Sequence, residues 1–186
     1  MKAGTVAGPR YPGQAMPQTT TTAPDPAARL HWEDFPEGSV HPFGGATLTR
    51  EAILEFARQF DPQPFHLDED AARASLFGGL CASGWHTCAL TMRMMCDAWL
   101  NRSASLGSPG LENIRWLKPV YVGDRLHGTM TVLQARPMAS KPHIGLVLQR
   151  WEVCNQHGEP VMTMEGWGML RRREPADTAE SPRPAG

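Results

Sequence analysis

The sequence predicts a single α+β domain in which a curved antiparallel sheet wraps around one long helix. Three observations lead to this prediction: two helical segments occur early in the chain, a longer helix follows that is apolar around most of its surface, and several strands come after it. Helices and strands that occur in separate runs are typical of α+β domains. A helix that is apolar on most sides is normally buried, here against the sheet.

The chain has 186 residues, enough for one domain of ordinary size. Residues 1–28 are rich in Pro, Gly, Ala and Thr and show no apolar periodicity, and residues 174–186 have the same character. Such segments bury too little apolar surface to fold, so we expect both to be disordered. One folded domain is therefore predicted over residues 29–173.

The segment TREAILEFARQF, residues 49–60, predicts the first helix because its apolar residues recur at helical spacing. Thr49 is its expected N-cap. The helix should end at Asp61, because the next residue is a proline and the residue before a proline disfavours helical backbone. A short second helix is predicted over residues 68–74, with Asp68 as its N-cap.

The segment SGWHTCALTMRMMCDAWLNR, residues 83–102, predicts the long central helix. Ser83 is its expected N-cap. Apolar side chains step by three or four positions along one stripe, and flanking apolar residues widen it. The stripe consists of Trp85, Cys88, Met92, Met95, Cys96 and Trp99.

Strands are predicted on both sides of these helices. One lies upstream, at GSVHPFGGATLT. Downstream, ENIRWLKPVYVGD gives a strand followed by a Pro-Val turn, and three longer strands follow at RLHGTMTVLQARPM, HIGLVLQRWEVCNQ and PVMTMEGWGMLRRR. The segment NQHGE between the last two is typical of a hairpin turn.

Composition excludes several classes of function. The formal net charge is −1, so there is no electrostatic case for nucleic acid or an anionic membrane as the main partner. The apolar runs fall short of the roughly 20 residues that a membrane span needs. The first residues lack the apolar core of a signal peptide, which makes a cytoplasmic location our expectation.

Cofactor and metal signatures are missing from the sequence. There is no P-loop and no GxGxxG after a strand, so no flavin or nicotinamide cofactor is expected. The four cysteines form no CxxC pair, and we interpret all of them as structural. The segment HLDED offers His66, Asp68 and Asp70 as ligands, but a helix cap and a first-turn acid explain the two carboxylates better. We therefore expect no metal.

The segment FDPQPFHLDED carries the strongest indication of chemistry. It places Asp61 and His66 five residues apart on a connector stiffened by two prolines. A carboxylate and an imidazole held at a set separation are suited to general acid–base catalysis. Taken singly, each has an ordinary interpretation: Asp61 could only end a helix, and His66 could be a loop or core histidine.

The stretch FARQFDPQPFHLDEDAARASLFGGLCASGWHT resembles the signature of the MaoC-like dehydratases, the family of R-specific enoyl-CoA hydratases. In that family an aromatic residue precedes Asp-x-Asn-Pro-x-His-x-Asp, then come a short Ala-rich helix and a Gly at the start of the central helix. The later IRWLKPVYVGDRL is similar to the family's strand and turn, so the resemblance covers about residues 35–172. Gln63 departs from the pattern, since the family usually has Asn there. The matching positions are Asp61, Pro64, His66, Asp68, Ala71, Ala72 and Gly84.

The resemblance implies a hot-dog fold and a homodimer in which two sheets join side by side. It also implies a hydro-lyase that reversibly adds water to a trans-2-enoyl thioester of coenzyme A or of a carrier protein, giving the (R)-3-hydroxyacyl form. Asp61 and His66 are then the catalytic pair that holds the water. Gly84 would let the thioester oxygen approach the N–H groups at the helix start, because it has no side chain. Ser83, Trp85 and His86 are candidate substrate-binding residues, His86 being alternatively a packed helix residue.

Two other functions remain open on the sequence alone. A hot-dog thioesterase would use a carboxylate and water to cleave the thioester. A non-catalytic subunit would bind an acyl thioester without turnover, although the presence of both Asp61 and His66 argues against it. The residues leave open the acyl chain length, the choice between coenzyme A and carrier protein, and which member of the pair takes the proton.

Overall fold

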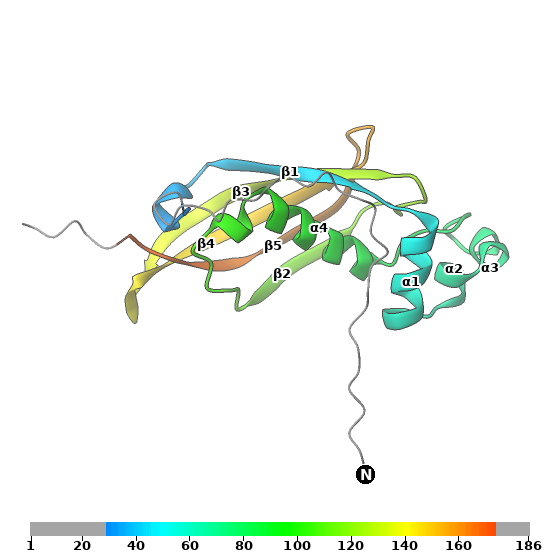
Figure 1. Cartoon of the computed structure of the whole chain (residues 1–186), viewed down its shortest axis with the longest axis horizontal. Helices are drawn as coiled ribbons and strands as arrows, with labels where there is room; N and C mark the ends of the chain where they lie inside the picture. The colour runs from blue at the N-terminus through cyan, green and yellow to red at the C-terminus, as the bar shows by residue number, and fades with distance from the viewer. Residues whose placement is uncertain (1–28, 174–186) are drawn as a thin grey trace, which may run out of the picture.

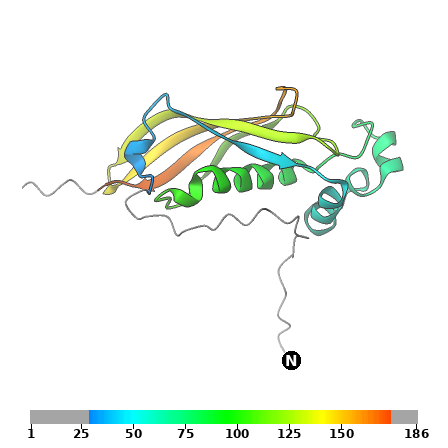
Figure 2. The same cartoon turned by 45° about the horizontal axis from the view of Figure 1, so that its top comes forward.

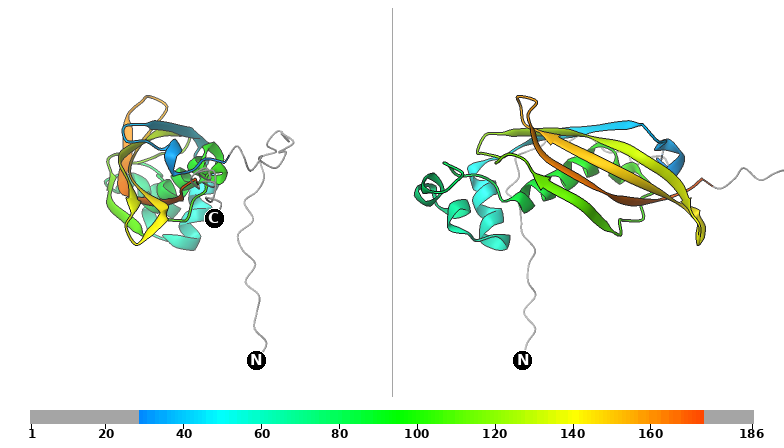
Figure 3. Two further views of the ribbon diagram at one scale, coloured as in Figure 1. Left: turned by 90° about the vertical axis from the view of Figure 1, so that its left-hand side faces the viewer. Right: turned by 180° about the vertical axis from the view of Figure 1, so that it is seen from behind.

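The computed structural model describes residues 29–173, so our expectations for residues 1–28 and 174–186 lie outside this part of the chain. Five strands form one antiparallel sheet in the order β1-β3-β4-β5-β2. The sheet curves around the helix α4, which lies along its concave face (Figures 1, 2 and 3). The predicted α+β architecture is confirmed. The strands are β1 (Val40–Thr47), β2 (Gly110–Trp116), β3 (Arg125–Met138), β4 (Lys141–Cys154) and β5 (Pro160–Arg171).

The helices lie mostly before the main group of strands in the chain. Three short ones, α1, α2 and α3, gather beyond one end of the sheet, at the end where α4 begins (Figure 1). No helix within residues 29–173 is long and apolar enough to cross a membrane. The helices are α1 (Arg50–Phe60), α2 (Pro64–Leu67), α3 (Glu69–Ala74) and α4 (Gly84–Ala98), with 3-10 turns η2 (Trp32–Asp34) and η3 (Leu100–Arg102).

The predicted helix starts are correct. Thr49, Asp68 and Ser83 each accept a hydrogen bond from a backbone N–H two or three residues further along the chain. Such caps satisfy N–H groups that have no partner within the helix, and each typically contributes about 1 kcal/mol. The first helix ends at Phe60, immediately before Asp61, as the following proline predicts.

The central helix differs from its prediction in which side it buries. Trp85 and Met92 of the predicted stripe are 58% and 50% exposed, whereas Thr87 and Thr91 are buried. The Thr91 hydroxyl donates to the carbonyl of Thr87 at 2.8 Å, so its polar atom is satisfied inside the helix and its methyl group faces the core. Apolar periodicity could not identify this face, because it counts threonine as polar.

The predicted end of the central helix is also wrong. The α-helix stops at Ala98 and the chain continues as the 3-10 turn η3, rather than as α-helix to Arg102. Trp99 leaves the helical conformation at φ −152° and ψ −25°. Its side chain is 6% exposed and packs on Phe35, with ring centroids 5.5 Å apart. The α-helix therefore ends about one turn before the predicted position, at the point where this large aromatic ring is buried.

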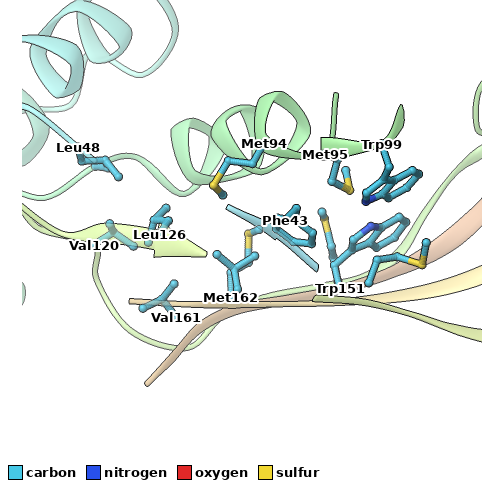
Figure 4. Packing of buried hydrophobic residues seen from close by; sticks show 14 of the residues in the cluster. Phe43, Leu48, Met94, Met95, Trp99, Val120, Leu126, Trp151, Val161 and Met162 are labelled. Carbon is cyan, nitrogen blue, oxygen red and sulfur yellow. The ribbon is translucent and has the colours of Figure 1, made fainter. Parts of the chain in front are cut away.

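The core lies between α4 and the concave face of the sheet. Figure 4 shows Met94 and Met95 of the helix, with Trp99 just beyond its end, above Trp151 and Met162 of the sheet. All five are at most 6% exposed. Burying a side chain of this size stabilises the fold by roughly 1.5–3 kcal/mol. This packing fixes the position of the helix, and therefore of its N-terminal end, relative to the strands.

His86 is part of the packing between the helices. Its ring is stacked on Phe56 of α1 with centroids 4.6 Å apart and an interplanar angle of 3°. The residue is 5% exposed, and within residues 29–173 its Nδ1 has no hydrogen-bond partner. Burial disfavours the charged ring and lowers the pKa of His86 from 6.5 to about 4.

This burial predicts a loss of stability in mild acid. Between pH 6.5 and 4 the unfolded chain binds a proton at His86 that the folded chain does not, so the free energy of unfolding falls as the pH falls through this window. From pH 7 to pH 5 the contribution amounts to about 2 kcal/mol. In His86→Phe this part of the loss should disappear, as measured by urea unfolding at both pH values. Equal losses in the two proteins would contradict a neutral, buried His86.

Candidate active site

Asp61 and His66 come together at the connector between α1 and α2. Asp61 is the residue after α1, and its backbone N–H still donates to the carbonyl of Ala57 at 2.9 Å. Pro64 occupies the first position of α2, where the backbone N–H that a proline lacks would have no partner within the helix. The single turn of α2 carries His66. The side chains face each other, with His66 Nε2 3.6 Å from Asp61 Oδ2. The predicted proximity of these two groups is observed.

The orientation of the His66 ring is fixed by a buried hydrogen bond. Nδ1 lies 2.9 Å from the backbone carbonyl oxygen of Cys81. A carbonyl oxygen only accepts, so Nδ1 must carry the proton and donate. In the neutral ring Nε2 is then an acceptor, and it is the nitrogen that faces Asp61.

Asp61 is surrounded by groups that favour its charged form. Partial burial alone would raise the pKa of Asp61, but hydrogen bonds from Ser83 and Gln63 lower it below the ordinary carboxyl value, and His66 lowers it further whenever its ring is protonated. The Gln63 side chain donates to Asp61 Oδ1 at 2.7 Å. Gln63 is the departure from the family pattern, and its longer amide side chain reaches the carboxylate directly.

The two groups can share one water that sits beside them, on the side of the cavity. At 3.6 Å the nitrogen and the oxygen are too far apart for a direct hydrogen bond. A carboxylate oxygen and an unprotonated Nε2 are both acceptors, so they do not bind each other. One molecule with two O–H donors can satisfy both. The pair is therefore suited to hold a water and to take a proton from it.

A cavity of about 390 Å³ adjoins this pair. Its volume lies within the usual range for small-molecule sites. The candidate residues Ser83, Gly84 and Trp85 line it, together with Asp61 and His66. His86 is absent from the lining, because its ring points into the helix packing against Phe56. Its interpretation as a packed helix residue therefore fits the structure better than a substrate contact.

Gly84 lies at the first position of α4, and its lack of a side chain accommodates a neighbour. A Cβ at this position would lie 2.5 Å from Cε2 of Trp116 and 2.7 Å from Nε1, closer than real Cβ contacts. The Trp116 Nε1 donates to the carbonyl oxygen of Gly84 at 3.0 Å. The glycine therefore has a packing reason in addition to the close approach of a thioester oxygen that the sequence suggested.

The other reactive groups near the pair have structural roles. Burial raises the pKa of the Cys81 thiol to about 11, so it remains protonated and is a poor nucleophile. Asp68 caps α3, and Asp70 pairs with Arg73. Within residues 29–173 no three His, Cys, Asp or Glu side chains are grouped as a metal site.

Three contributors to the site were missed from the sequence. Cys81 acts through its backbone carbonyl, which no side-chain pattern identifies. Gln63 was noted only as a departure, although its place two residues after Asp61 allows the contact that is observed. Trp116 comes from the edge strand β2, and only the packing of that strand beside the start of α4 brings it to the cavity.

Comparison with known proteins gives a consistent result. The profile of the MaoC like domain matches residues 34–147. The MaoC-like dehydratase from Rhodospirillum rubrum is 42% identical, with a TM-score of 0.73, and the alignment covers 78% of this chain and 99% of that one. The mesaconyl-CoA hydratase of Cereibacter sphaeroides is 37% identical over 86 residues, which are 46% of this chain and 24% of that protein.

The fold is shared more widely. The R-hydratase PhaJ1 from Pseudomonas aeruginosa has a TM-score of 0.61 at 21% identity, with 84% of this chain and 96% of that chain covered. At this identity the likeness concerns the fold alone. The hot-dog architecture expected from the sequence is confirmed. The matched segment contains Asp61, His66 and the start of α4, and it extends over more than half of the sequence. This chain therefore belongs to the MaoC-like dehydratase domain family, whose members include hydratases and dehydratases of acyl thioesters.

Proposed function

We propose that this protein is a hydro-lyase that reversibly hydrates trans-2-enoyl thioesters of coenzyme A or a carrier protein to the (R)-3-hydroxyacyl form. The observation that carries the proposal is the 3.6 Å gap between His66 Nε2 and Asp61 Oδ2, two acceptors that face each other beside a cavity. Family membership supports the reaction class, and the R configuration is carried over from the family.

The reaction requires one water, one base and a proton for carbon 2. In the hydration direction the water oxygen bonds to carbon 3 while one water proton passes to the acceptor pair. The electron pair of the double bond moves toward the thioester carbonyl, and carbon 2 then takes a proton back from the pair. Asp61, whose pKa is lowered, supplies a carboxylate at neutral pH. His66 supplies a nitrogen that accepts a proton while Nδ1 stays bonded to Cys81. Such groups typically contribute a factor of about 10² to 10⁴ in rate.

The thioester oxygen needs a donor when negative charge builds up on it. The first turn of α4 supplies N–H groups that lack intrahelical partners, and the helix dipole favours negative charge there. Ser83 Oγ already accepts the N–H of Trp85. We therefore assign the N–H of Gly84 to the thioester oxygen, in a site where one such donor is worth roughly 3–4 kcal/mol.

The first expected outcome concerns the pair itself. Asp61→Asn and His66→Ala should each lower kcat/KM for the best enoyl thioester by at least about a hundredfold, because each removes one acceptor for the water. Loss of enoyl absorbance measures the hydration, and free thiol is followed in the same assay. Asp97→Asn and His127→Ala, at exposed positions outside the cavity, are the matched controls. Near-normal activity in either variant of the pair would refute the assignment, and thiol release by the wild type would identify a thioesterase.

A second outcome concerns pH. Ser83 helps to lower the pKa of Asp61, so Ser83→Ala should raise that pKa toward the ordinary value. If the carboxylate is the active form, acidification should then abolish activity at a higher pH than in the wild type, as measured by the pH dependence of kcat/KM. Thr49→Ala is the control, because it removes another N-cap at a similar cost of about 1 kcal/mol without touching Asp61. An acid limb that does not move in Ser83→Ala would contradict the proposed role of Asp61.

We also propose that the protein is a homodimer joined through β2. This strand is at the edge of the sheet, and an open edge favours pairing with another strand. Pairing of β2 with the same strand of a second copy would satisfy the backbone N–H and C=O groups that this edge leaves free.

Light scattering tests the assembly. A dimer predicts a solution mass of about twice the 20.5 kDa of one chain, or a multiple of that value if dimers associate further. A monomer that retains full hydratase activity would overturn the proposal.

A further inference from the structure

A second, larger cavity lies along α4 beside the candidate active site. It has a volume of about 550 Å³ and extends from Trp85 at the start of the helix to Trp99 at its end. We call it the apolar groove, because its walls are formed mainly by apolar side chains of α4, β2 and β5. These include Cys88, Ala89, Met92, Leu111, Met164 and Trp167. Its size is typical of ligand sites, yet the proposed chemistry makes no use of it.

Two tryptophans stand where the catalytic cavity and the apolar groove adjoin. Trp85 lines both cavities, and Trp116 lines the catalytic one. Their rings meet edge to face, with centroids 5.5 Å apart and an interplanar angle of 76°. Trp116 also lies beside the thiol of Cys88, a residue that lines the groove. The two indoles therefore lie at the junction between the catalytic cavity and the groove.

Trp116 is held in this position from more than one side. Its Nε1 donates to the Gly84 carbonyl at 3.0 Å, and its ring fills the space that a side chain on Gly84 would need. Trp85 contacts it from the side. Turning Trp116 away would break the hydrogen bond and the aromatic contact together, so the ring is held in place at the junction of the two cavities.

We propose that Trp116, supported by Trp85, limits the acyl group of the substrate to the catalytic cavity and makes this protein selective for short acyl thioesters. The apolar groove becomes available to longer chains only when the Trp116 ring is removed. Trp116 is thus a specificity-determining residue. The proposal rests on the proposed hydratase function, because it takes the acyl thioester as the ligand of the cavity.

The dependence of kcat/KM on acyl chain length tests whether Trp116 limits the substrate in this way. The wild type should hydrate a four-carbon enoyl-CoA with a kcat/KM at least about a hundredfold above that for a ten-carbon one, because the added methylenes of the longer chain meet the Trp116 ring and force a strained fit. In Trp116→Ala the ratio of ten-carbon to four-carbon kcat/KM should rise by at least about 30-fold as methylenes enter the groove. The ratio cancels any loss of activity that both substrates share. Trp116→Phe keeps a ring without the N–H donor, and it should give a smaller rise if Trp116→Ala is poorly folded.

Ala89 provides the matched control. It is an exposed residue of α4 that lines the groove and not the catalytic cavity. Ala89→Phe should leave the four-carbon activity of the wild type unchanged, because the native substrate does not enter the groove. Combined with Trp116→Ala, it should return the chain-length ratio to within about threefold of the wild-type value, because the new ring fills the space for the added methylenes.

Three results would overturn the proposal. The wild type could hydrate both chain lengths equally, the chain-length ratio could be unchanged in Trp116→Ala, or the rise in this ratio could persist when Ala89→Phe is added to Trp116→Ala. Failure of the proposed function gives a different result, namely no hydration at any chain length. Calorimetric binding of saturated butanoyl-CoA and decanoyl-CoA then tests this role of Trp116 without turnover. Trp116→Ala should bind decanoyl-CoA at least about 30-fold more tightly than the wild type does, with little change for butanoyl-CoA. Equal binding in the two proteins would refute this role.

Discussion

The burial of α4 in the concave face of the sheet is the constraint on which the rest of the structure depends. Met94 and Met95 are buried between the helix and the strands, so the helix can neither rotate nor slide without exposing them. Its first residue, Gly84, is consequently held at one end of the sheet. The connector between α1 and α2 then packs against a fixed helix terminus. A site that needs a donor and two acceptors at set separations can be assembled only on such a fixed element.

The pair formed by Asp61 and His66 depends on this arrangement through one buried hydrogen bond. The carbonyl of Cys81, just before the start of α4, receives the proton of His66 Nδ1. The same segment supplies Ser83, which caps α4 and acts on the carboxylate of Asp61. The positions of the start of α4, the imidazole of His66 and the carboxylate of Asp61 therefore depend on one another. Displacing the segment would disturb the tautomer of the histidine, the charge of the aspartate and the helix terminus at once.

The residues around Gly84 show how packing and chemistry share one position. The missing side chain admits the indole of Trp116 and leaves the helix start open to a ligand. The indole also lies where the cavity that contains the reacting groups adjoins the larger apolar groove. Under the proposed function, the side chains at this junction would decide how much of the space beside α4 a substrate can use.

Prediction from sequence succeeded where a local physical rule applies. The proline after Asp61 disfavours helical backbone at Asp61, and Thr49, Asp68 and Ser83 cap helices because their side chains reach nearby N–H groups. It failed for the buried face of α4, because threonines that bond to their own helix behave as apolar residues. It also failed at Trp99, where the large ring is buried against a residue far away in the chain.

By itself, the sequence determined the order of the elements, the wrapped-sheet architecture and the acid–imidazole pair, because these depend on spacing along the chain. Only the tertiary structure decided which atoms serve the pair. The carbonyl of Cys81 and the indole of Trp116 reach the site from separate segments. Neither has a sequence signature. Every residue has a backbone carbonyl, and a tryptophan in a strand ordinarily belongs to the hydrophobic core. The fold brings them to the site because the buried α4 sets its own first turn against both the connector and the edge strand.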